Sequence, residues 1–187
     1  IMSKLETNTI DNISGSSTLT IGSTNTSTIT LKSGATLTNF PDNTPSFLAT
    51  MSAGQSIAND TNVKIQFNTE EYDTDGAYDP STNYRFTVPT GEGGKYMVSA
   101  YIRSGSVSDG GKIELKIYKN GSHYNPMFFV TEAAGDDQDS VGVSQVMELS
   151  AADYLEVYVL HQSGGAISFS NSASIGSTFS AYKLIGA

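Results

Sequence analysis

Apolar and polar residues alternate along the chain from Phe47 onward. Around residue 98, Tyr96, Val98 and Ala100 share one face, and Lys95 and Ser99 lie on the other. The alternation recurs in five further sets: Val63, Ile65 and Phe67; Ile113, Leu115 and Ile117; Val143, Met147 and Leu149; Leu155, Val157 and Val159; and Phe179 with residues 182–184. A period of two is typical of strands with one buried face. The pattern predicts an all-β sandwich of roughly eight to ten strands.

Residues 1–45 follow a different pattern, in which apolar residues are sparse. More than half of the segment 12–40 is Ser, Thr or Asn, and its apolar residues form three pairs: Leu19 with Ile21, Ile29 with Leu31, and Leu37 with Phe40. So little apolar surface cannot offset the entropy of ordering about 35 residues, at ~1–2 kcal/mol each for the backbone alone. The segment is therefore either a disordered linker or a β-stalk that buries these pairs against copies of itself, and the regular spacing favours the stalk.

Pro41 and Pro45 mark a boundary between these two patterns, because proline interrupts strand pairing. We expect a stalk region at 1–45 and a sandwich domain at 46–187. The segment MSKL, from Met2, resembles a native N-terminus. The net charge is −9, and residues after 45 hold 8 basic against 16 acidic side chains, so the acidic surface belongs to the sandwich.

The composition argues against several classes of function. An acidic surface repels phosphate backbones, and no basic cluster offsets it, so we expect no nucleic-acid binding. The chain has no cysteine, so it has neither disulfides nor thiolate metal sites. No window approaches the ~20 apolar residues of a membrane span, and no secretory signal is present in IMSKLETNTI.

The loop EEYDTDGAYD is the best candidate for a metal site. Asp73, Asp75 and Asp79 place carboxylates at short spacing around Gly76, as calcium requires. However, Tyr84 stands where a calcium loop would have a bidentate Glu at its twelfth position, so a solvated hairpin remains the alternative. A second acidic loop, weaker as a candidate, contains Glu132, Asp136, Asp137 and Asp139.

No motif points to catalysis. His123 and His161 have no ligand spacing between them, and we expect both to be ordinary surface residues. The segment GEGGK lacks the spacing and the Ser or Thr of a phosphate loop. A glycan-cleaving enzyme would require a carboxylate pair ~5–10 Å apart in a cleft. We therefore expect a protein that is not an enzyme and has no cofactor other than a calcium ion.

One stretch, YDPSTNYRFTVPTGEGGKYMVSA, resembles the complement one-q globular head, a jelly roll of the tumour-necrosis-factor-like superfamily. The resemblance is carried by Tyr78 and Asp79; by Phe86, Thr87 and Pro89; and by Gly94 and Tyr96. The segments YKNGS, MELSAADYLEVYV and STFSAYKL extend it over about 47–187. Val98 and Ala100 replace the usual aromatic residues, and Ala152 and Ala181 replace glycines.

Members of this family form compact trimers with aromatic residues at subunit boundaries, and some bind calcium. Tyr84, Phe86, Tyr96 and Tyr101 cannot all fit inside one small sandwich. The alternation turns Tyr96 inward and Tyr101 outward, so Tyr101 is a candidate interface residue. The resemblance thus implies a homotrimer with Tyr101, Tyr154 and Tyr158 at the interface of the head. The β-stalk interpretation adds the apolar pairs Leu19, Ile21, Ile29, Leu31, Leu37 and Phe40 to that interface. Tyrosines that simply cover a sheet are the alternative.

A Thr/Ser-rich stalk followed by such a head resembles fibre and appendage proteins of tailed bacteriophages. This implies a virion structural protein on a tail or head fibre, located at the particle surface, whose N-terminal peptide docks onto other virion proteins. The head would adhere to a host-surface glycan or protein without membrane insertion. Its exposed tip is expected at 73–78, 122–125 and 136–139, with Tyr78, His123, Tyr124, Asp136, Asp137 and Asp139. A bacterial cell-surface or secreted adhesin is the alternative.

Overall fold

The computed structural model describes Ser33 and residues 43–130, 138–169 and 176–185. The chain divides into two compact units, Ile1–Phe40 and Pro41–Ala187, and every described strand belongs to the second. The predicted stalk pairs from Leu19 to Phe40 lie outside the described residues, as do Glu132, Asp136 and Asp137.

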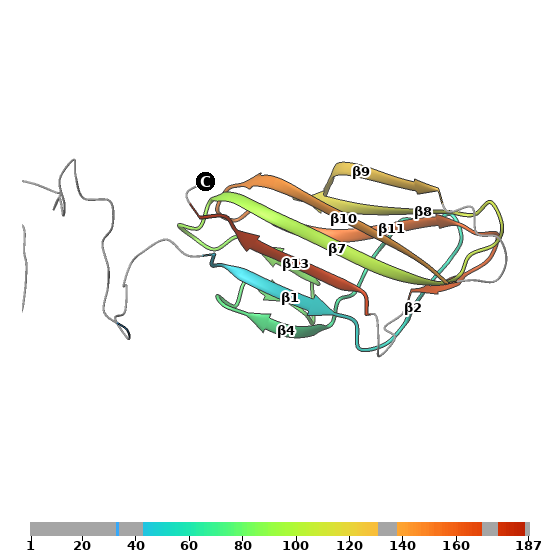
Figure 1. Ribbon diagram of the computed structural model, residues 1–187, viewed down its shortest axis with the longest axis horizontal. Helices are drawn as coiled ribbons and strands as arrows, with labels where there is room; N and C mark the ends of the chain where they lie inside the picture. Colours follow the sequence, from blue (N-terminus) through green and yellow to red (C-terminus); the bar gives the residue numbers. More distant parts are fainter. Residues whose placement is uncertain (1–32, 34–42, 131–137, 170–175, 186–187) are drawn as a thin grey trace, which may run out of the picture. The chain divides into compact units, whose positions relative to one another are not determined.

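The second unit consists of two antiparallel sheets packed face to face (Figure 1). In the first sheet the strand order is β2–β12–β7–β13–β1–β4, and β10 pairs with the other edge of β7. The bounds are β1 Ser46–Thr50, β2 Gln55–Ile57, β4 Thr69–Asp73, β7 Gly94–Ser106, β10 Gln138–Leu149, β12 Ile167–Phe169 and β13 Thr178–Lys183.

The second sheet has the order β5–β6–β11–β8–β9, with β3 paired to β11 beside β6. The bounds are β3 Val63–Lys64, β5 Tyr78–Asp79, β6 Arg85–Thr87, β8 Lys112–Lys119, β9 Ser122–Val130 and β11 Tyr154–Gln162. The all-β sandwich predicted from the sequence is thus confirmed. The described residues form thirteen strands, more than expected, because five of them have only two or three residues and are too short to show an alternation.

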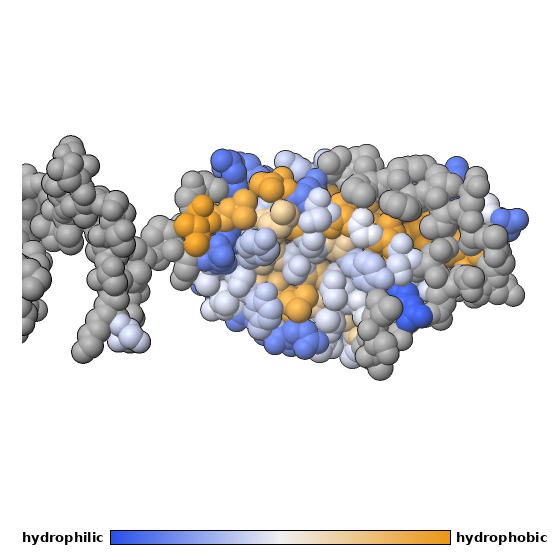
Figure 2. Space-filling view, in the orientation of Figure 1, coloured by the Kyte–Doolittle hydropathy of each residue, from blue (hydrophilic) through white to orange (hydrophobic). Residues whose placement is uncertain are grey.

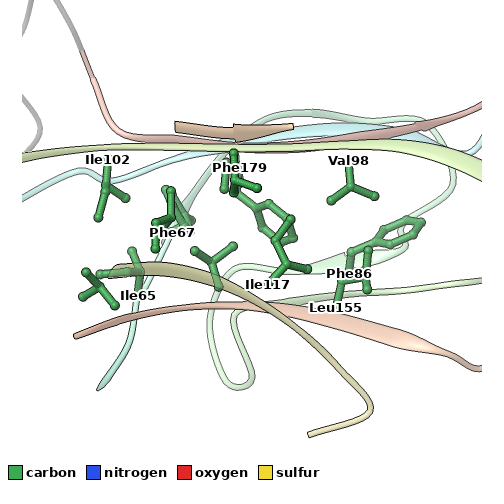
Figure 3. Packing of buried hydrophobic residues seen from close by; sticks show 14 of the residues in the cluster. Ile65, Phe67, Phe86, Val98, Ile102, Ile117, Leu155 and Phe179 are labelled. Carbon is green, nitrogen blue, oxygen red and sulfur yellow. The ribbon is translucent and has the colours of Figure 1, made fainter. Parts of the chain in front are cut away.

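The hydrophobic core lies between the two sheets. Tyr96, Val98, Ala100 and Ile102 of β7 are buried, and so are the predicted apolar sets of β8 and β11. An aromatic cluster fills one part of this layer: Phe47 stacks on Tyr78 and Phe86 with ring centroids 4.7 and 5.0 Å away, and Phe179 meets Phe47 edge-on at 5.0 Å. Figure 3 shows Phe86 and Phe179 projecting from opposite sheets into this shared layer.

The turn between β8 and β9 has the geometry that the sequence indicates. Asn120 and Gly121 have φ values of 54° and 74°, as a two-residue hairpin turn of type I′ requires. The Asn120 Oδ1 atom accepts a hydrogen bond from the Tyr154 amide at 2.9 Å, and its Nδ2 donates to Asp153 at 2.7 Å. The turn is therefore tied to the start of β11.

The sandwich has two ends, which we call the near end, where β1 begins, and the far end, opposite. At the near end the Thr74 hydroxyl accepts from the Ser46 amide at 2.9 Å, which places the loop 74–77 there. The turn at Asn120 lies at the same end, because Lys119 pairs with Leu155, Leu155 with Phe86, and Phe86 with Tyr78. β10 begins at the far end, where Gln138 pairs with Ser106.

Candidate functional site

The loop predicted to bind a metal is held by hydrogen bonds to its own backbone. The Asp73 carboxylate accepts from the Asp75 amide at 3.2 Å and from the Tyr78 amide at 2.7 Å. Gly76, with φ 61°, takes the left-handed conformation that this turn needs. Asp73 therefore closes the turn between β4 and β5.

Asp79 performs the same task for the next turn. Its carboxylate accepts hydrogen bonds from the backbone amides of Ser81 (3.0 Å), Thr82 (2.9 Å) and Asn83 (3.0 Å) and from the Asn83 side chain (2.8 Å). These bonds, led by those of Thr82 and Ser81, hold the pKa of Asp79 far below its usual range, against the opposing effect of burial.

The Asp73 and Asp79 carboxylates thus serve two separate turns, and the Asp75 carboxylate accepts a hydrogen bond from the Thr74 hydroxyl at 2.5 Å. Among the residues that the structure describes, no three His, Cys, Asp or Glu side chains gather as metal ligands would. Asp79 accepts five hydrogen bonds within its own turn, four from protein N–H groups and one from the Ser81 hydroxyl at 3.1 Å. The calcium site stays a prediction from sequence spacing, and the second acidic loop falls largely outside the described residues.

The outward face of the first sheet carries Tyr101, and we call it the Tyr101 face. Between the two ends of the sheet, its outward residues on β10, β7, β13 and β1 are small, hydroxylated or apolar: Gly142, Ser144, Val146, Met97, Ser99, Tyr101, Thr178, Ser180, Tyr182, Leu48 and Thr50. The charged outward residues of these strands, Lys95, Arg103 and Glu148, lie nearer the ends. Figure 2 shows pale and orange residues over the centre of the visible face and most of the blue residues at its margins.

A depression of about 320 Å³ lies in the centre of the Tyr101 face. Its lining includes Tyr101, Gly142, Ser144 and Thr178. It opens because Gly142 has no side chain: a Cβ there would lie 3.5 Å from Tyr101 Cδ2 and 3.6 Å from the Ala100 carbonyl oxygen. The centre of this face can therefore receive a side chain from another molecule.

Tyr154 and Tyr158, the other two predicted interface tyrosines of the domain, lie on the outward face of the second sheet. The Arg85 guanidinium carbon is 4.3 Å from the centroid of the Tyr154 ring. The Tyr158 ring lies 4.1 Å from that of Tyr118. Burial raises the pKa of Tyr158, and the negative charge of Glu156 raises it further. The predicted interface tyrosines are thus divided between two opposite faces of the sandwich.

The residues around Tyr158 include Tyr118 and Asn62, which the sequence did not single out, and His123, which it placed at the exposed tip. His123 stacks on the other side of Tyr118 at 5.5 Å, and Asn62 donates to the Tyr118 hydroxyl at 2.9 Å. The two-residue turn was a usable signal, because it places Tyr118 and His123 opposite one another. Asn62 gave no such signal, since it is 56 residues away from Tyr118.

The predicted exposed tip is wrong in two respects. Tyr78 has only 5% of its surface exposed, because its ring stacks on Phe47 and its hydroxyl donates to the Phe67 carbonyl at 2.8 Å. The three loops also do not share one end, since 73–78 and 122–125 lie at the near end and β10 begins at the far end. His123 and Tyr124 are exposed as expected, and the side chain of Asp139 lies outside the description.

The expectation of an exposed His161 is also wrong. The ring is fully buried, its Nε2–H donates to the Ile57 carbonyl at 2.9 Å, and its Nδ1 lies 3.2 Å from the Ser163 hydroxyl. His161 continues the inward set of Leu155, Val157 and Val159 along β11. It fastens β11 to the end of β2, and it belongs to no group of metal ligands among the described residues.

No helix in the described part of the chain meets the length and hydropathy of a membrane span. The comparison with curated proteins found no match. Among solved structures, the chain is similar to the tumour necrosis factor Eiger of S. frugiperda, with 15% identity and a TM-score of 0.49, over 76% of this chain and 92% of that one. It is also similar to the globular domain of zebrafish complement 1qA, with 14% identity and a TM-score of 0.47, over 74% of this chain and 93% of that one.

The model of the C1q domain matches residues 46–184. The match begins where β1 begins and ends one residue beyond β13. Domains of the C1q and tumour-necrosis-factor-like kind are binding and structural modules that often mediate trimerisation. The chain therefore belongs to the C1q domain family, and its two-sheet unit is a C1q/TNF-like jelly roll.

Proposed function

We propose that this chain is a homotrimeric virion structural protein, a tail or head fibre or appendage whose C1q-like head adheres to a host surface. Its N-terminal segment docks onto other virion proteins, its stalk pairs are buried among three copies, and the chain performs no covalent chemistry. The Thr/Ser/Asn-rich segment and its regular apolar pairs support the fibre, and the Tyr101 face is the observation that carries the trimer.

The Tyr101 face suits a subunit contact because its centre lacks charge. Three successive rows across the sheet, through Met97, Ser99 and Tyr101 of β7, contain no ionised side chain on β10, β7, β13 or β1. In a chain with a net charge of −9, an uncharged surface of this extent is unusual on a monomer. Its exposure to water is unfavourable, and its removal from water on binding another chain costs little solvation free energy.

The edge of the first sheet formed by β10 also supports a subunit contact. β10 is a twelve-residue strand that pairs with β7 and with no other strand of the described chain. A long unpaired edge is a template for unwanted pairing, and natural proteins cover it. When each copy sets its β10 edge against the Tyr101 face of the next, the two contact surfaces differ, and three such contacts close a ring. The depression beside Gly142 then receives a neighbour's side chain.

The molar mass in solution tests the trimer. We expect the full chain to sediment as three 19.8-kDa chains, about 59 kDa, at micromolar concentration. Gly142→Lys places a charge in the centre of the Tyr101 face and should give a monomer. Gly165→Lys is the matched control, because Gly165 is exposed and nothing lies within 4 Å of a Cβ there. A monomeric unmodified chain, or a Gly142→Lys trimer, contradicts the assembly.

The virion location has its own test. An antibody against the head should label particles purified from the source of the chain, and capsid and tail genes should adjoin its gene. Labelling of cell envelopes beside secretion genes would instead support the bacterial adhesin, which would use the same trimer.

A further inference from the structure

The outward face of the second sheet holds a column of three aromatic rings, which we call the aromatic column: Tyr158, Tyr118 and His123. Adjacent rings lie 4.1 and 5.5 Å apart, with planes 31° and 22° from parallel. They come from β11, β8 and β9, which are neighbours in the sheet. The rings therefore stand side by side across the strands, with the exposed His123 at one end.

Polar side chains fix the column and border it. The Asn62 side chain donates from Nδ2 to the Tyr118 hydroxyl at 2.9 Å, and Lys116 Nζ donates to Asn62 Oδ1 at 3.4 Å. Lys116 also pairs with Glu114 at 2.7 Å, and Lys64 pairs with Glu156 at 2.9 Å. Because these groups already hold one another, the column is arranged before a ligand arrives, which lowers the entropic cost of binding.

The chemistry of this face argues against a protein partner and against an anionic ligand. Its outward strand positions are aromatic, charged or polar, with Leu160 as the aliphatic exception in β3, β6, β8 and β11. The buried centre of a protein–protein contact is normally apolar, with charged residues depleted. The charges beside the column form two complete ion pairs and leave no net charge there, and the chain as a whole repels anions at −9.

We propose that the aromatic column is a binding site for an uncharged saccharide. The apolar C–H face of a pyranose packs on an aromatic ring, while its hydroxyls need hydrogen-bonding polar groups at the rim. His123 offers the exposed ring, and Asn62, Glu114 and Lys116 supply the rim. Tyr154 is not part of the site, because the Arg85 guanidinium already covers its ring.

This inference rests on the proposed adhesion and gives it a ligand class. The column lies on the face opposite the Tyr101 face, so a trimer built on the latter leaves three columns facing outward. One such site binds weakly, and three copies on one fibre gain strength by avidity.

The test measures saccharide binding by the full chain. Maltotriose, chitotriose and mannotriose are the neutral probes, and 3′-sialyllactose is the acidic comparator. Saturation-transfer NMR and calorimetry should detect at least one neutral probe, bound more tightly than the acidic one. His123→Ala and Tyr158→Ala should each weaken binding about tenfold. Tyr72→Ala removes a tyrosine of the first sheet that is 48% exposed and should leave binding unchanged.

Each other outcome has a definite meaning. His123 is exposed, so a folded His123→Ala variant that still binds fully would remove the column from the site. A folded trimer that binds none of the neutral probes, or prefers the acidic one, overturns the saccharide and leaves a protein as the partner. A monomer that still binds maltotriose through the column would contradict the assembly and leave this inference standing.

Discussion

The two outward faces of the sandwich come from the same alternation of residues but differ in content. The Tyr101 face has serine, threonine, glycine and isolated apolar side chains, and its charges lie toward its ends. The face with the aromatic column has cations and carboxylates at its centre, each paired with a neighbour. A face without charge loses little when another chain covers it, whereas paired charges around fixed rings suit a small polar ligand. The comparison supports the proposals of assembly through the first sheet and of saccharide recognition through the second.

The largest effect on stability should come from a substitution in the hydrophobic core, which lies between the two sheets and supports both outward faces. Phe47→Ala removes a fully buried ring that contacts Tyr78, Phe86 and Phe179. We expect a loss of about 3–5 kcal/mol in the free energy of unfolding, because a cavity replaces the stacked ring. Urea denaturation measures this loss. Tyr72→Ala, on the neighbouring strand β4, should cost no more than about 0.5 kcal/mol.

If the faces depend on one core, trimer formation and saccharide binding should weaken together in Phe47→Ala. Loss of one with the other intact would show that the sheets are less coupled than their shared aromatic cluster indicates.

The sequence predicted those parts of the molecule that depend on local pattern. The sandwich, the turn at Asn120 and the inward direction of Tyr96 follow from alternation and turn chemistry. The burial of His161 could also have been predicted, because His161 stands two residues after Val159 and so continues the inward-facing positions of β11. The aromatic column was not, because it requires β11 to pair with β8 and Asn62 to reach Tyr118. The burial of Tyr78 depends in the same way on stacking against Phe47, 31 positions earlier.

A smaller effect should follow from breaking an ion pair of the second sheet. Lys64→Met leaves the Glu156 carboxylate, whose side chain is 8% exposed, without its cation at 2.9 Å. We expect a loss of about 1–2 kcal/mol in the free energy of unfolding, reduced from the fully buried case because Lys64 is 28% exposed. The double variant Lys64→Met/Glu156→Leu should regain most of it.

The matched pair of the first sheet is Lys183 with Glu92, whose carboxylate side chain is 37% exposed. Lys183→Met should cost no more than about 1 kcal/mol by the same denaturation experiment. Equal losses for Lys64→Met and Lys183→Met would show that an ion pair contributes the same stability in both sheets.

Acid should weaken the turns of the second sheet that Asp79 and Asp153 hold. Backbone amides lower the pKa of Asp79. At Asp153, burial raises the pKa, but hydrogen bonds from Lys119, Asn120 and the Ser150 amide outweigh it and bring the pKa to about 2. A carboxyl with a lowered folded-state pKa contributes stability above its unfolded pKa, near 4, and loses it as the pH falls through the folded value. The free energy of unfolding should therefore fall from about pH 4 toward pH 2.

Asp153→Asn should be less stable than the unmodified chain at pH 7 and should lose less on acidification, as denaturation at a series of pH values would show. An unchanged slope in that variant would mean that Asp153 has no part in the acid response.

The smallest expected effect on stability concerns Tyr154, whose ring lies on the second sheet but outside the aromatic column. Arg85→Ala removes the guanidinium 4.3 Å from the Tyr154 ring, and we expect a loss of about 0.5–1 kcal/mol in the free energy of unfolding. Lys95→Ala, at an exposed position of β7, should change it by no more than about 0.5 kcal/mol. Arg85→Ala should leave the affinity for saccharide unchanged, because Tyr158, Tyr118 and His123 keep their contacts. A gain in affinity would show instead that the uncovered Tyr154 ring joins the binding surface, so that Arg85 sets the limit of the recognition face.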